Sequence, residues 1–121
     1  RLSFNQVIPV PQEGTLEGRC QTFNGLLRYD LETGETQRYD YGEGVYGSEA
    51  PVAAARGHGP EGDETRAYPV LFTTDSNDWT SYCLIFDAAD ITRPIARVKI
   101  PRRISIGFHT TWVDGADIWA E

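Results

Sequence analysis

Residues 67–88 read AYPVLFTTDSNDWTSYCLIFDA, and this stretch decides the predicted fold. Two runs rich in β-branched and aromatic residues, 67–74 and 80–87, flank Ser-Asn-Asp, which is a typical turn sequence. The pattern predicts two antiparallel strands joined by a short turn. Further out, residues 95–100 alternate in polarity and predict a third strand, and residues 49–54 predict a fourth.

The four predicted strands follow one another through short connections. This order favours a four-stranded antiparallel meander of about 50 residues, the size of one β-propeller blade. A second predicted hairpin, 26–31 with 36–41, turns at Gly34 and would supply the two outer strands of the preceding blade. The expected fold is therefore all-β, a fragment of about two propeller blades. A β-sandwich explains the strands less well, because consecutive strands would have to alternate between two sheets.

Composition limits the classes of partner. The chain has 121 residues, which predicts a single domain, and its net charge of −7 argues against a nucleic-acid or anionic membrane surface. Cys20 and Cys83 lie 63 residues apart (83 − 20) without a Cys-x-x-Cys motif, so a structural zinc site is not expected. Two reduced thiols in a cytoplasmic protein are the expected state.

A histidine and a glutamate occupy matching places in this scheme. Glu49 opens one predicted innermost strand, and His109, in the segment ISIGFHTTW (104–112), is expected to open the next. They are 60 residues apart (109 − 49), about one blade plus a loop. Innermost strands line a propeller's channel, so both side chains are expected to face the axis, where a carboxylate would fix the tautomer of a metal-binding imidazole. The alternatives are a lone histidine bonded to a carbonyl and a surface carboxylate.

Two segments resemble a known family. GFHTTW (107–112), preceded by ARVKIPRRIS (96–105), resembles the C-terminal region of the carotenoid cleavage oxygenases and lignostilbene dioxygenases. The segment LLRYDLETGETQRYDYGEGVYGSEAPV (26–52) resembles an earlier part of that family, in which an acidic residue lies near Gly-Glu-Pro; here an alanine separates Glu49 from the proline. The resemblance covers roughly residues 20–118.

The resemblance implies a seven-bladed β-propeller with a helical cap and, on its axis, Fe(II) held by four histidines. Carboxylates hydrogen-bond the other ring nitrogens of several of these histidines. At the matching positions, His109 is the last iron ligand and Glu49 is one of the carboxylates. Residues 1–121 would be the C-terminal part of one propeller domain, truncated at both ends, with the remaining blades upstream. His58 matches no ligand motif.

The implied function is that of a non-haem Fe(II) dioxygenase. It would cleave a C=C bond of a carotenoid, apocarotenoid or stilbene with O₂ and give carbonyl products, with a slight preference for phenolic stilbenes. The isolated chain is expected to be inactive and weakly folded. The expected location is cytoplasmic, with peripheral attachment to a membrane through parts outside this chain as the alternative.

Other classes stay open on the residues alone. One is a non-catalytic propeller or sandwich that recognises a partner through Trp79 and its loops, and another is a calcium-dependent propeller hydrolase. Phe108 is expected to pack in the core on the face opposite His109. Arg102 and Arg103 are expected to be solvated, and residues 56–64 to form a flexible insertion between strands.

Overall fold

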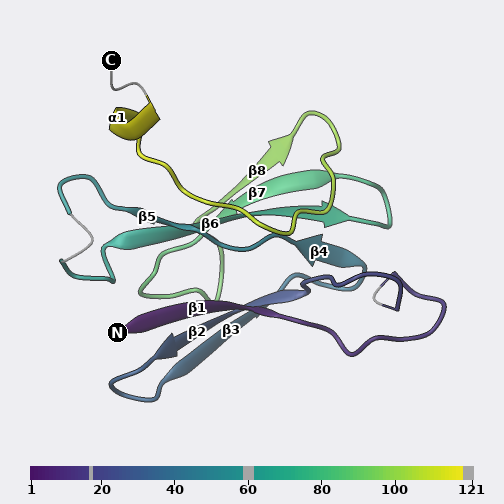
Figure 1. Cartoon of the computed structure of the whole chain (residues 1–121), viewed down its shortest axis with the longest axis horizontal. Helices are drawn as coiled ribbons and strands as arrows, with labels where there is room; N and C mark the ends of the chain where they lie inside the picture. Colours follow the sequence, from purple (N-terminus) through teal and green to yellow (C-terminus); the bar gives the residue numbers. More distant parts are fainter. Residues whose placement is uncertain (17, 59–61, 119–121) are drawn as a thin grey trace.

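Two antiparallel sheets make up the computed structural model, which describes residues 1–16, 18–58 and 62–118 (Figure 1). The first sheet has the order β1-β2-β3, and the second has the order β4-β6-β7-β8, with β5 also paired to β6. The elements are β1 (Leu2–Val7), β2 (Gly25–Asp30), β3 (Thr36–Asp40), β4 (Val45–Gly47), β5 (Val52–Ala54), β6 (Ala67–Asp75), β7 (Ser81–Ile85), β8 (Ala96–Ile100) and the short helix α1 (Gly115–Ile118).

The all-β prediction is confirmed apart from the single turn of helix. The predicted hairpin corresponds to β2 and β3, and the three consecutive strands β6, β7 and β8 lie within two residues of their predicted bounds. Strand β1 was not predicted, although Leu2 and Phe4 alternate with polar residues. It pairs along its whole length with β2, from Leu2 opposite Asp30 to Val7 opposite Gly25. No helix in the described ranges is long and apolar enough to cross a membrane.

The predicted continuous strand 49–54 is wrong, because it is interrupted where it runs beside β6. Gly47 pairs with Thr73 and Val52 pairs with Pro69. Four residues, 48–51, therefore lie opposite three, 70–72. One extra residue on one strand of an antiparallel pair is a β-bulge, which bends the strand and redirects a side chain. Glu49 lies in this bulge, between β4 and β5.

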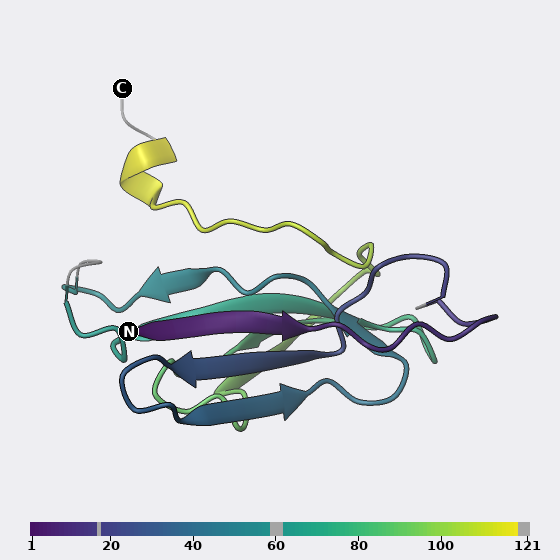
Figure 2. The same cartoon turned by 60° about the horizontal axis from the view of Figure 1, so that its bottom comes forward.

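The strand predicted to begin at His109 is also wrong. Residues 101–114 form no strand, and they run as an extended segment along the second sheet toward α1, which stands away from both sheets (Figure 2). A strand needs a neighbour with free backbone groups. Within the ranges the structure describes, no strand pairs with this segment through backbone hydrogen bonds, and its backbone is bonded mainly by side chains and by residue 49.

The core lies between the two sheets. Leu26 from β2 packs in one cluster with Leu71 from β6, Leu84 from β7, and the following Phe86 and Ile91. Four of these side chains have no exposed surface, and Leu84 is 4% exposed. Full burial of one such side chain contributes about 1.5–3 kcal/mol. This cluster holds the sheets face to face and so fixes where the bulge lies.

Three turns share the motif Asp-x-Thr. In each turn the aspartate accepts hydrogen bonds from both the backbone N–H and the hydroxyl of the threonine two residues later, at 2.6–3.0 Å. The hydrogen bond from the hydroxyl, and to a smaller extent that from the backbone N–H, lowers the pKa of each aspartate below its usual range. The pairs are Asp63 with Thr65, Asp78 with Thr80, and Asp90 with Thr92.

Trp79 lies inside the second of these turns. Its backbone φ is 60°, a left-handed conformation that is uncommon for a bulky residue. The side chain is 51% exposed, and the Arg103 guanidinium lies 5.0 Å from the ring centroid. Trp79 is therefore exposed at this turn, and the cation over its ring comes from the segment that leads to His109.

Candidate metal-ligand site

Two buried hydroxyls anchor the start of the segment that carries His109. The Thr74 and Ser81 hydroxyls lie 2.9 Å apart. Ser81 Oγ accepts the Ile104 N–H at 3.1 Å, and Thr74 Oγ1 donates to the Ile104 carbonyl at 3.2 Å. Both side chains lie on the sheet face opposite the core, yet each is only 1% exposed. This burial shows that the C-terminal segment covers that face.

Gly107 brings the segment against the bulge. A Cβ at position 107 would lie 2.8 Å from the Ser48 Cβ, closer than side-chain carbons approach. The next residue along, Phe108, accepts a hydrogen bond from the Glu49 N–H through its carbonyl at 3.2 Å. The absence of a side chain at Gly107 therefore allows residues 108–110 to lie directly beside Glu49.

The prediction that Phe108 packs in the core is not confirmed, because the residue is exposed and lies outside the core cluster of the described residues. Its ring stacks on the buried Phe23 with centroids 5.2 Å apart, although 40% of Phe108 stays exposed. The prediction that His109 points to the opposite face is wrong, because the Phe108 and His109 rings contact edge to face at 4.5 Å. The alternation assumed a paired strand, and this segment is not one.

The structure brings His109 and Glu49 together. The His109 Nδ1 lies 3.2 Å from Glu49 Oε1, and the Thr110 N–H donates to Glu49 Oε2 at 3.2 Å. The imidazole is 78% exposed, and Glu49 is 35% exposed. With Nδ1 donating to the carboxylate, Nε2 is the nitrogen left to bind a metal ion. A histidine so arranged suits metal ligation, because the carboxylate orients the ring.

Among the described residues, His109 is the single imidazole in this arrangement. No group of three or more His, Cys, Asp or Glu side chains that could hold a metal ion is found among them. His58, the other histidine, follows β5, where its backbone N–H donates to the Ala55 carbonyl at 2.9 Å. The two cysteines are free thiols, exposed at Cys20 and half-buried at Cys83. The donor set is compatible with a metal only if other ligands come from outside these residues.

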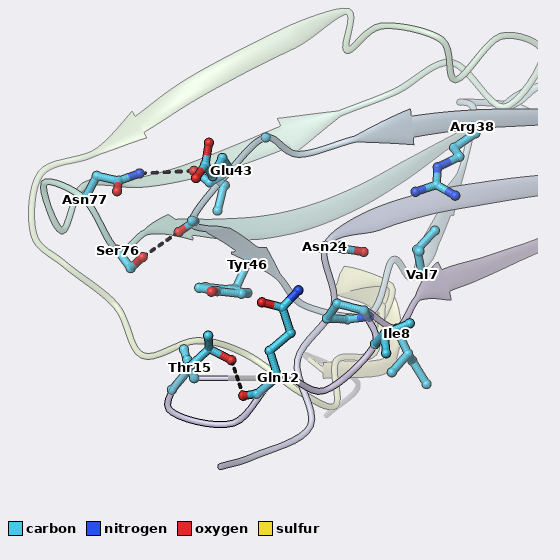
Figure 3. A pocket seen from close by; sticks show the side chains of 16 residues that line it. Val7, Ile8, Gln12, Thr15, Asn24, Arg38, Glu43, Tyr46, Ser76 and Asn77 are labelled. Carbon is cyan, nitrogen blue, oxygen red and sulfur yellow. Dashed lines mark hydrogen bonds between the residues drawn. The ribbon is translucent and has the colours of Figure 1, made fainter. Parts of the chain in front are cut away.

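A separate pocket of about 840 Å³ opens at one end of the two sheets (Figure 3). Apolar residues of the loop after β1, such as Ile8, line one side. The other side is made by the turns before β4 and after β6, where Ser76 Oγ donates to the Gly44 carbonyl and Asn77 to the Glu43 carbonyl. Neither His109 nor Glu49 lines this pocket.

Comparison with known proteins identifies the family. Residues 4–114 match the family model described as retinal pigment epithelial membrane protein. The chain is 41% identical over 114 residues to a carotenoid 9,10(9',10')-cleavage dioxygenase 1 of Phaseolus vulgaris, and 32% identical over 101 residues to carotenoid cleavage oxygenase 1 of Neurospora crassa. These matches cover 83% and 84% of the chain. The chain belongs to the carotenoid cleavage oxygenase and lignostilbene dioxygenase family, as its sequence motifs indicate.

A solved structure has the same fold. The lignostilbene dioxygenase of Pseudomonas brassicacearum superposes with a TM-score of 0.74 over 94% of this chain, at 24% sequence identity. The alignment covers 24% of that structure. The chain likewise spans 21% and 19% of the two curated relatives. It therefore corresponds to about a fifth to a quarter of the proteins it matches.

Sequence reasoning missed two residues that shape this site, Ser48 and Gly107, and left open whether Thr110 shapes the surroundings of the metal. Ser48, Gly107 and Thr110 each contact Glu49 or the residue beside it. Thr110 lies next to His109 in the sequence, but its strand propensity explained it equally well. Nothing in the sequence distinguishes Ser48 or Gly107 from other small residues at strand ends, because their contacts lie across about 60 residues of chain.

Proposed function

We propose that this chain is the C-terminal part of a seven-bladed β-propeller dioxygenase that cleaves a C=C bond with O₂. In this proposal His109 is one of four histidines that hold Fe(II), and Glu49 is the carboxylate that fixes its ring. The substrate is a carotenoid, an apocarotenoid or a stilbene, and the products are two carbonyl compounds. Family membership and the 3.2 Å contact between His109 and Glu49 support the proposal.

The strand order agrees with this architecture. The second sheet is a meander in which β4 and β5 together form the first strand, followed by β6, β7 and β8. In the proposed propeller this sheet is one blade, with Glu49 on its innermost strand. Sheet β1-β2-β3 supplies outer strands of the preceding blade. The segment 104–112 then enters the next blade and carries His109 to the axis.

In that centre, this chain would supply one ligand, His109, and the carboxylate that orients its ring, Glu49. Fe(II), with His109 as one of its neutral imidazole ligands, would supply the chemistry of O₂. Glu49 holds the His109 proton at Nδ1, so that Nε2 is free to act as a ligand, and its negative charge lies next to the ring. Phe108, stacked on Phe23, places an apolar ring against the same imidazole.

The alternatives receive less support. The non-catalytic recognition module is not favoured, because the curated relatives are named as oxygenases and dioxygenases. Trp79 is exposed but is already covered in part by Arg103. A calcium-dependent hydrolase would need a cluster of acidic residues, and none that could hold a metal ion is found in the described ranges.

The test compares the two histidines in the full-length protein. We expect His109→Ala to lose bound iron and aldehyde formation from both a carotenoid and a stilbene substrate, because one of the four iron ligands is missing. His58→Ala is the matched control and should keep both. Iron is measured by metal analysis and aldehydes by chromatography. Full iron content and turnover in His109→Ala would refute the assignment, whichever alkene is cleaved.

A further inference from the structure

Glu49 is held by two neighbouring residues, Ser48 and Thr110, to which the family motifs assign no role. Ser48 is fully buried, and its hydroxyl bridges the bulge. Ser48 Oγ accepts the Phe72 N–H at 3.1 Å and donates to the Glu49 carbonyl at 2.7 Å. The Ser48 N–H also donates to the Phe72 carbonyl at 2.9 Å. The hydroxyl therefore replaces backbone hydrogen bonds that the extra residue would otherwise leave unmade.

Thr110, from the C-terminal segment, also hydrogen-bonds Glu49. Its hydroxyl donates to the Glu49 backbone carbonyl at 2.9 Å, so this carbonyl accepts one hydroxyl from each flank. Its backbone N–H donates to Oε2 at 3.2 Å. Because Oε2 is occupied in this way, Oε1 is the oxygen left to face His109 Nδ1. The backbone carbonyl and the carboxylate of Glu49 are therefore both hydrogen-bonded, although the side chain is partly exposed.

We propose that Ser48 and Thr110 are positioning residues that hold the Glu49 carboxylate against His109 Nδ1. They act through Glu49 and do not touch the metal themselves. A flexible glutamate would rotate into solvent and leave the imidazole free to turn, since the ring is largely exposed. The two hydroxyls fix the Glu49 backbone beside residue 110, and this places the Thr110 N–H against the carboxylate before a metal ion binds. This inference rests on the proposed function, because it assigns His109 as a ligand.

The experiment measures Fe(II) affinity of the full-length protein, by competition with a chelator and without substrate. We expect Thr110→Val to weaken Fe(II) binding by about 10-fold or more, because partners of ligating residues contribute at this level. Thr110→Ser restores the hydroxyl and should restore the affinity. Thr111→Val is the matched control, since Thr111 is exposed and makes no side-chain hydrogen bond within the described ranges. The iron-free proteins should melt within a few degrees of one another.

Ser48→Ala is the second variant, in case Thr110→Val folds poorly, and it should also weaken Fe(II) binding. Unchanged affinity in Thr110→Val and Ser48→Ala would overturn the positioning role while leaving the proposed function intact. An equal loss in Thr111→Val would overturn it too, because the effect would then be general. If the wild-type protein binds no Fe(II), the proposed function fails, and this inference fails with it.

Discussion

Gly107 decides how closely the C-terminal segment approaches the bulge. Its Cα lies against Ser48, and the two residues after it supply the phenyl ring and the imidazole of the candidate site. Its φ is not in the left-handed region, so the requirement for glycine is one of space and not of backbone conformation. A single methyl group at this position would separate His109 from Glu49.

We therefore expect Gly107→Ala to destabilise the full-length protein by about 1–3 kcal/mol, as overpacking does elsewhere, and to lower its iron content. The methyl group would meet the Ser48 Cβ at 2.8 Å, and Ser48 is fully buried, so the segment has to move outward. Thermal unfolding and metal analysis measure the two effects. Gly115→Ala is the control, because nothing lies within 4 Å of a Cβ there. A normal iron content in Gly107→Ala would contradict this account.

Strands β6 and β7 serve the core and the candidate site through opposite faces. Leu71 and Leu84 pair across the two strands and face the other sheet, while Thr74 and Ser81 pair on the face covered by the C-terminal segment. Successive side chains of a strand point to opposite faces of the sheet, so one strand can contribute to the core and to the candidate site. Among the described residues, this hydroxyl pair supplies the side-chain hydrogen bonds of the Ile104 backbone.

Replacing Thr74 by valine should release the start of the C-terminal segment. The Ile104 carbonyl loses its donor and Ser81 loses a partner, so we expect a loss of about 1 kcal/mol in unfolding free energy. Faster amide hydrogen exchange over residues 104–110 should accompany it. Thr73→Val is the control, since Thr73 is also buried but shows no side-chain hydrogen bond within the described residues. Equal exchange in the two variants would argue against the anchoring role.

At the scale of the molecule, the two sheets share one core but leave strand edges unpaired. Strands β1 and β8 each have one partner among the described strands, and β5 pairs only with β6. Unpaired edges attract other strands, and a few open strands fold only marginally by themselves. In the proposed propeller, neighbouring blades and the upstream part of the chain complete these edges and supply the other ligands.

We expect residues 1–121, produced alone, to self-associate and to bind no stoichiometric Fe(II). One imidazole with one carboxylate beside it is too small a donor set to retain the ion. Light scattering after size-exclusion chromatography reports the association state, and metal analysis after anaerobic loading reports the iron. A monomer that holds one iron per chain and cleaves an alkene would disprove this prediction.

The sequence by itself determined the all-β class, the hairpin β2–β3, the meander from β6 to β8, and the family. These features rest on local alternation, turn residues and short motifs, which are read within a few residues. The tertiary structure alone decided that the strand before Glu49 is broken by a bulge, and that Ser48, Gly107 and Thr110 surround it. It also decided that residues 104–112 lie on the second sheet without joining it. These features depend on contacts between residues about 60 positions apart, and local patterns do not encode the register of such contacts.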